Sequence, residues 1–249
     1  MSTRTAAPKK SRNLTAAKPP EKLSRSDLRA MAAMRQAAKI RARYDAAATT
    51  NDNKNHWANT DDLSARAANS LAVRRILRRR SRYECANNSY AAGMLLTLSN
   101  DVVGSGPRLQ MQTADGAYNT LVEREFAAWQ RDVQFGRKLR TLCITKPRDG
   151  EGFARLTTNP NHESPVWLDW ELVETDQVTT PALVPARDHI DGIWFDAYQQ
   201  PEFYDILDQH PGDQDQTPFN MTPKKIAAKD VIHWFREDRP GQKRGVPEI

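Results

Sequence analysis

Apolar residues change their spacing near Pro147, and this change limits the folds open to the chain. Before Pro147 they recur every three or four residues, which is the period of an amphipathic α-helix. After Pro147 they alternate with polar residues, which is the period of a half-buried β-strand. Strands joined by short turns pair in the antiparallel sense. We therefore expect an α+β fold, with a helical part first and a mostly antiparallel, β-rich part second.

Composition divides the chain further. Residues 1–25 are rich in Lys, Ser, Ala and Pro and hold few large apolar side chains, so we expect a disordered basic arm. Residues 26–147 then form the helical part and residues 148–249 the β-rich part. Twelve basic and three acidic residues precede Ala46, whereas 25 basic and 28 acidic residues follow Asp45. Such an arm is typical of a solubilising tail, or of contact with nucleic acid, an acidic membrane surface or an acidic protein.

Helix signals fill most of the region before Pro147. We expect helices over Ser26–Ala48, from Asp61 or Asp62 to about Arg82, and over Tyr83–Asn100, with turn formers at Asn51–His56 and a short strand at Arg108–Thr113. The clearest apolar stripe predicts one more amphipathic helix that packs in the core. Its members are Tyr118, Val122, Phe126, Trp129, Val133 and Gly136.

Strand signals follow Pro147. The predicted strands are Phe153–Thr158, Val166–Val173, Gly192–Asp196, Glu202–Leu207 and Asp230–Phe235. The third and fourth flank a turn at Gln199–Pro201 and therefore indicate a hairpin.

A cluster of arginines near the end of the second predicted helix supplies the candidate contact residues. At about 100° per residue, five arginines fall within an arc of about 140°. They are Arg74, Arg75, Arg78, Arg79 and Arg82. The opposite side carries Val73, Ile76, Leu77 and Tyr83, so the helix has a basic face and an apolar face. The basic face suits a solvated helix end, contact with phosphates, or contact with an acidic subunit.

The sequence shows no motif typical of catalysis, cofactor binding or metal binding. Cys85 and Cys143 stand apart from each other and from histidine, which predicts two reduced, partly buried thiols rather than a disulfide or a zinc site. Gly104 and Gly106 lack the residues of a phosphate-binding loop, and the five histidines are scattered. The carboxylate pairs Asp169 with Glu171 and Glu174 with Asp176 fit solvated strand faces. We expect no enzyme, no cofactor and no metal.

Several blocks of sequence, in collinear order from about residue 38 to residue 249, strongly resemble the lambda-type portal proteins of tailed bacteriophages. They are Ile40–Ala47, His56–Ser70, Arg82–Gly93, Ser99–Gln110, Glu174–Val178 and Asp230–Pro247. The resemblance implies a structural virion protein, a dodecameric ring at one capsid vertex through which double-stranded DNA is packaged and ejected. It implies contacts with other copies of the chain, terminase, capsid and head–tail connector proteins, and synthesis in the bacterial cytoplasm.

The resemblance also assigns the helical and β-rich parts to the outer wing of a portal. Members of the family continue into stem, clip and crown, so we expect this chain to be an N-terminal portion, a truncated reading frame or a decayed prophage gene. The alternative function is that of a stand-alone basic nucleic-acid-binding protein, favoured by the basic arm and the arginine face. No segment approaches the roughly 18 apolar residues that span a bilayer, so we expect no membrane partner.

Overall fold

The computed structural model of the chain describes residues 24–40, 47, 49–180, 189–213 and 222–249. The chain divides into two compact units, Met1–Asp62 and Leu63–Ile249. In the first unit, helix α1 (Arg25–Ile40) is capped by Ser24, whose Oγ accepts a hydrogen bond from Asp27 N at 3.2 Å. Residues 51–59 form turns, as predicted. Residues 1–23 of the expected disordered arm, and most of the predicted helix beyond Ile40, lie outside the described residues.

The second unit contains the other helices: α2 (Ala65–Ala68), α3 (Leu71–Asn87), α4 (Ser89–Val103), α5 (Gly116–Asp132) and α6 (Phe135–Asp149). The predictions of unbroken helices to Arg82 and from Tyr83 onward are wrong, because polar caps interrupt the chain. Ser64 caps α2, Ser70 precedes α3, and the Asn88 side chain accepts from Tyr90 N at 3.0 Å to start α4. Apolar periodicity continues across these caps and does not reveal them.

The predicted helix over Tyr118–Gly136 is also interrupted. Gln134 adopts a left-handed conformation with φ of 54°, which ends α5 and begins α6. Val133 is buried in the core, whereas Phe126 and Trp129 are half-buried and Tyr118 is exposed. The predicted strand at Arg108–Thr113 is wrong, because this segment forms no strand. Met111 N donates instead to the Glu123 side chain at 2.8 Å, so a helix carboxylate satisfies its backbone.

Two antiparallel sheets follow. One has the order β2-β1-β7, with β1 (Glu151–Thr158), β2 (Leu168–Val173) and β7 (Val231–Phe235). The other has the order β3-β4-β5-β6, with β3 (His189–Ile190), β4 (Ile193–Phe195), β5 (Pro201–Ile206) and β6 (Lys224–Ala227). The five predicted strands are confirmed, including the β4–β5 hairpin, while β3 and β6 were not predicted. The α+β class is confirmed.

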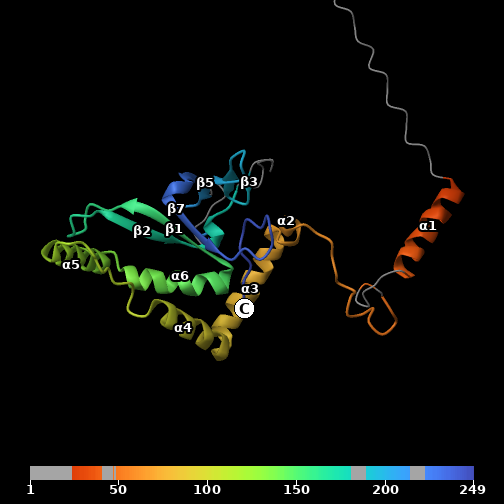
Figure 1. Cartoon of the computed structure of the whole chain (residues 1–249), viewed down its shortest axis with the longest axis horizontal. Helices are drawn as coiled ribbons and strands as arrows, with labels where there is room; N and C mark the ends of the chain where they lie inside the picture. The colour runs from red at the N-terminus through yellow and green to blue at the C-terminus, as the bar shows by residue number, and fades with distance from the viewer. Residues whose placement is uncertain (1–23, 41–46, 48, 181–188, 214–221) are drawn as a thin grey trace, which may run out of the picture. The chain divides into compact units, whose positions relative to one another are not determined.

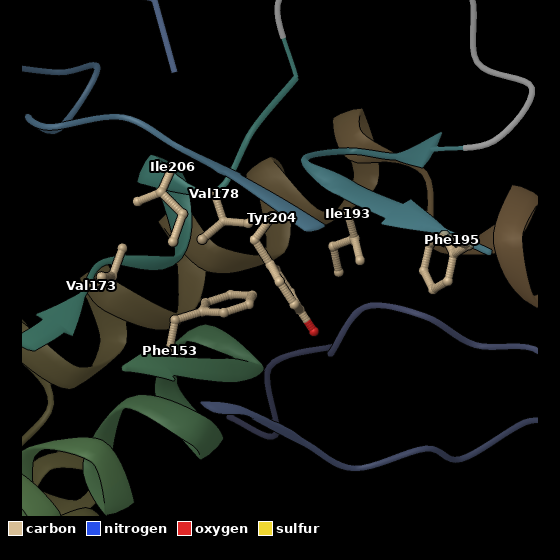
Figure 2. Close-up of a cluster of buried hydrophobic side chains, with 7 residues drawn as sticks. All are labelled: Phe153, Val173, Val178, Ile193, Phe195, Tyr204 and Ile206. Carbon is tan, nitrogen blue, oxygen red and sulfur yellow. The ribbon is translucent and has the colours of Figure 1, made fainter. Parts of the chain in front are cut away.

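The layers of the second unit stack around strand β1. Helix α6 covers one face of the β2-β1-β7 sheet, where Leu142 packs with Ala154 and Trp170, and α4 packs on α6 from the other side (Figure 1). On the opposite face of β1, Phe153 joins Ile193, Tyr204 and other residues from the second sheet in one apolar cluster (Figure 2). No helix in the described ranges is long and apolar enough to cross a membrane.

The apolar cluster gives the first testable prediction. Phe153→Ala should lower the free energy of unfolding by about 3–5 kcal/mol, because Phe153 is 1% exposed and its removal leaves a cavity between the two sheets. Tyr198→Ala, at a residue 84% exposed, is the control and should change it by less than about 0.5 kcal/mol. Urea unfolding followed by circular dichroism measures both. Equal effects of the two substitutions would show that the sheets do not share a core.

Candidate functional site

Helix α3 turns part of its basic face inward. Arg74 and Arg78 are buried, and Arg82, one further turn along the same side, is half-buried. Arg75 and Arg79 are exposed. The structure therefore divides the five predicted contact residues, three facing the interior of the second unit and two facing outward, and the single basic face expected from the sequence is corrected.

The expected apolar face of α3 is corrected as well. Val73, Ile76 and Tyr83 are 39%, 48% and 65% exposed, and Leu77 is half-buried. The helix thus buries charge and exposes apolar side chains, the reverse of an ordinary surface helix. The reason lies in the β-rich part, which supplies carboxylates to the inner side of α3.

The first of these carboxylates is Glu151 at the start of β1, which is fully buried. Arg244 Nε donates to both of its oxygens at 2.9 Å, and Arg244 Nη2 lies 2.8 Å from Oε1. Gly245 N and His233 Nε2 each lie 3.0 Å from Oε2, and Arg78 Nη1 lies 3.5 Å from Oε1. Glu151 therefore joins α3, β7 and the C-terminal segment at one point.

Three aspartates complete the arrangement. Asp191, in the β3–β4 turn, pairs with Arg74 and lies 3.3 Å from Arg244 Nη1. Asp176, in the 3₁₀ turn Thr175–Gln177, lies 2.8 Å from both Arg78 and Arg82. Asp149, at the end of α6, accepts from Arg82 Nε at 2.8 Å.

We call these eight residues the buried ion-pair network: Arg74, Arg78, Arg82, Arg244, Asp149, Glu151, Asp176 and Asp191. Within this set four guanidinium groups face four carboxylates, so their formal charges cancel, and the partly exposed Arg148 also pairs with Asp149 at 3.0 Å. Such balance is needed because an unpaired buried charge costs several kcal/mol. Burial lowers the pKa of Arg74 to about 10, which still leaves it charged at neutral pH.

Electrostatics keep Glu151 ionised. Burial alone would raise its pKa, but the charge of Arg244 and the hydrogen bond from His233 outweigh burial and hold the pKa well below its usual value. Burial lowers the pKa of His233, and the positive charges of Arg244 and Arg74 lower it further. Together they outweigh the hydrogen bond and the negative charge of Glu151, which raise it. A neutral His233 donates a hydrogen bond from Nε2 to Glu151. Its Nδ1 accepts one from the Tyr204 hydroxyl, and these two atoms are 3.4 Å apart.

The network offers no room for a ligand. The cavity beside Arg74 and Arg244 has a volume of about 10 Å³, the size of a single water molecule at most. A cavity of about 730 Å³ lies elsewhere and is lined mainly by apolar residues such as Trp129, Leu139 and Trp234. The described residues include no group of three His, Cys, Asp or Glu side chains that could hold a metal ion. The network joins α3, the end of α6, β1 and the C-terminal segment through ion pairs.

The remaining sequence candidates have structural partners. Cys85 and Cys143 are both free thiols, half-buried and buried, as predicted. Asp169 lies 2.6 Å from Lys138 Nζ, and Glu171 pairs with Arg155. Asp176 belongs to the network, so the expectation of solvated strand faces is wrong for Asp169 and Asp176, whose side chains are 16% and 17% exposed. Glu171 and Glu174 fit it, since their side chains are 56% and 63% exposed.

Sequence reasoning gave no role to Glu151, Asp191 or Arg244. Their partners lie far along the chain, 93 residues apart for Glu151 and Arg244, so no local spacing relates them. The sequence held one indication that Arg244 matters, since Arg244 lies within the block Asp230–Pro247 that carries the family resemblance.

The buried acid and histidine predict a pH dependence. In the folded chain, His233 and Glu151 bind protons less readily than in the unfolded chain, because the pKa of each is lowered. The unfolded state therefore gains protons first, and the free energy of unfolding should fall as the pH drops, from near the ordinary histidine pKa of 6.5 downward. The fall can reach about 1.4 kcal/mol per pH unit for each proton.

Urea unfolding between pH 7.5 and pH 4 measures this dependence. His233→Gln should flatten the upper part of the curve, between about pH 7 and pH 5.5, whereas the exposed His56→Gln should not. A free energy of unfolding that stays constant from about pH 7 to pH 5 would contradict the assignment of His233 as a buried neutral base.

Comparison with known proteins agrees with the resemblance noted in the sequence. The profile of the family described as "Phage portal protein, lambda family" matches residues 50–249. A probable portal protein of Halomonas phage phiHAP-1 is 27% identical over 189 residues, which cover 68% of this chain and 36% of that relative. The chain thus spans about a third of the length of the curated relative that it matches. The family match covers all of the second compact unit, from Leu63 to Ile249, and with it the whole buried ion-pair network. The chain belongs to the lambda family of phage portal proteins.

Proposed function

We propose that the chain is a structural subunit of a phage portal, a dodecameric ring at one vertex of the capsid through which double-stranded DNA is packaged and ejected. Its partners in this role are other copies of the chain, terminase, capsid and head–tail connector proteins. It is made in the bacterial cytoplasm and becomes part of the virion. It has no catalytic activity, cofactor or membrane partner of its own.

The observation that carries this proposal is the family match over residues 50–249. The buried ion-pair network supports it, because a balanced set of charges braces α3, β1 and the C-terminal segment without leaving space for a substrate. A subunit that must withstand the passage of DNA benefits from such a brace. As in the sequence-based assignment, residues 26–147 and 148–249 would be the helical and β-rich parts of the portal wing, preceded by the basic arm of residues 1–25.

The alternative, a stand-alone nucleic-acid-binding protein, has less support. It needs a basic face that tracks phosphates, but Arg74, Arg78 and Arg82 are engaged with carboxylates inside the chain. Only Arg75 and Arg79 of the five candidates are exposed. The basic arm lies mostly outside the described residues and gives this alternative no structural support.

Incorporation into particles tests the proposed function. In cells that produce the phage encoding this chain, we expect the chain to co-purify with heads at a small, fixed ratio to the capsid protein. Quantitative mass spectrometry of gradient-purified heads measures this ratio, and gold-labelled antibody viewed by electron microscopy should mark one vertex per head. Heads that lack the chain, or that carry label at many vertices, would contradict the proposal.

A further inference from the structure

The outward side of α3 is a surface that the buried ion-pair network leaves unexplained. We define the outer α3 face as Val73, Arg75, Ile76, Arg79, Arg80 and Tyr83, all of which are exposed. At about 100° per residue, Val73, Ile76, Arg79, Arg80 and Tyr83 point roughly 100° or more away from the mean direction of Arg74, Arg78 and Arg82, and Arg75 lies at the edge of the face, about 20° from Arg82. Arg75, Arg79 and Arg80 form no ion pair with any described residue, whereas the inner arginines are matched by carboxylates.

The composition of the outer α3 face is that of a protein interface. Apolar side chains interleaved with arginine are enriched at the centres of interfaces, while a helix facing only water usually shows polar residues. Ile76 projects between Arg79 and Arg80 around the helix axis, so any surface that reaches both guanidinium groups must also cover Ile76. The partner therefore needs apolar atoms and negative charge together.

The need for apolar atoms together with negative charge favours a protein over a nucleic acid as the partner of the outer α3 face. A phosphate backbone would pair with the three arginines, but it would gain nothing by covering Val73, Ile76 and Tyr83. A protein surface that carries carboxylates is stabilised both by ion pairs with the arginines and by contact with the apolar side chains. Guanidinium–carboxylate pairs are strong and directional, and the apolar contact excludes water.

The second unit carries an exposed acidic surface that can supply the negative charge. We define the acidic loop as Asp208 and Asp213, which follow β5, together with Glu174. His210 contacts two of these residues: its Nε2 lies 3.3 Å from the Glu174 carboxylate, and its backbone N donates to the Asp213 side chain at 3.2 Å. Asp208 pairs with the exposed Lys224 at 2.7 Å. All three carboxylates are exposed and are not members of the buried ion-pair network.

We propose that the outer α3 face binds the acidic loop of a second copy of this chain. The identity of the partner as a second copy rests on the proposed portal function, and the choice of surface rests on charge complementarity between the two faces. Because the two faces are different, the contact is heterologous, and repetition of it closes a ring or extends a filament.

Charge reversal on each side tests the contact. Arg75→Glu with Arg79→Glu makes the outer α3 face acidic, and Asp208→Lys with Asp213→Lys makes the acidic loop basic. Each double variant alone should self-associate at least about tenfold more weakly than wild type, and an equimolar mixture of the two should associate as wild type does. Arg131→Glu, at an exposed arginine of α5, is the matched control and should behave as wild type. Sedimentation velocity up to about 100 μM measures association.

The substituted residues are exposed, so circular dichroism melting should place every variant within about one degree of wild type. A wild-type chain that stays monomeric throughout, variants that associate normally, or a mixture that does not re-associate would each overturn the proposal. The same samples are tested against duplex DNA by fluorescence anisotropy between about 50 and 200 mM salt. A log–log salt slope lowered by about two in the arginine variant would overturn it too and would place Arg75 and Arg79 in a nucleic-acid site.

Failure of this contact is distinguishable from failure of the portal function. If the wild-type chain is found at one vertex of the head but the charge variants associate normally, the portal function stands and the ring contact lies on another surface. If the chain is absent from heads, the portal function fails whatever the sedimentation experiment shows.

Discussion

The pairing of Glu151 with Arg244 is the interaction on which the second unit depends. Both side chains are almost completely inaccessible to water, and each stabilises the buried charge of the other. Glu151 also reaches α3 through Arg78 and β7 through His233, while Arg244 reaches the β3–β4 turn through Asp191. One ion pair therefore links helices, both sheets and the C-terminal segment, and it explains why α3 turns arginines rather than apolar residues inward.

Two glycines make this pairing sterically possible. A Cβ atom on Gly245 would lie 1.9 Å from the carbonyl oxygen of Gly150, and a Cβ on Gly150 would lie 2.6 Å from the backbone of Val246. Gly150 also has φ of 91°, a conformation that residues with a side chain rarely adopt. The C-terminal segment can thus lie directly against the end of α6 and the start of β1, which brings Arg244 into contact with Glu151. A larger residue at either position would separate the two charges.

The features predicted correctly from the sequence are those set by local spacing. The five strands, the β4–β5 hairpin and the helical first half follow from apolar period and turn residues near each element. The interruptions at Ser70, Asn88 and Gln134 were missed because neither the polar N-cap residues Ser70 and Asn88 nor the left-handed backbone at Gln134 changes the apolar period. The sequence predicted one basic face on this helix, and its division into buried and exposed arginines was not foreseen. That division depends on Glu151, Asp176 and Asp191, which reach α3 only through tertiary contacts. The family resemblance was recognised from blocks of sequence and agrees with the family match.

A double-mutant cycle between Glu151 and Arg244 tests the central claim most directly. Glu151→Gln, Arg244→Met and the double variant are unfolded in urea at pH 7, and the three losses of unfolding free energy are compared. If the pair braces the unit, each single substitution should cost about 3–5 kcal/mol, because it strands the other charge in the interior. The double variant should then cost less than the sum of the two by at least about 1 kcal/mol. Losses that simply add, or single losses below about 1 kcal/mol, would show that the unit is held together without this ion pair.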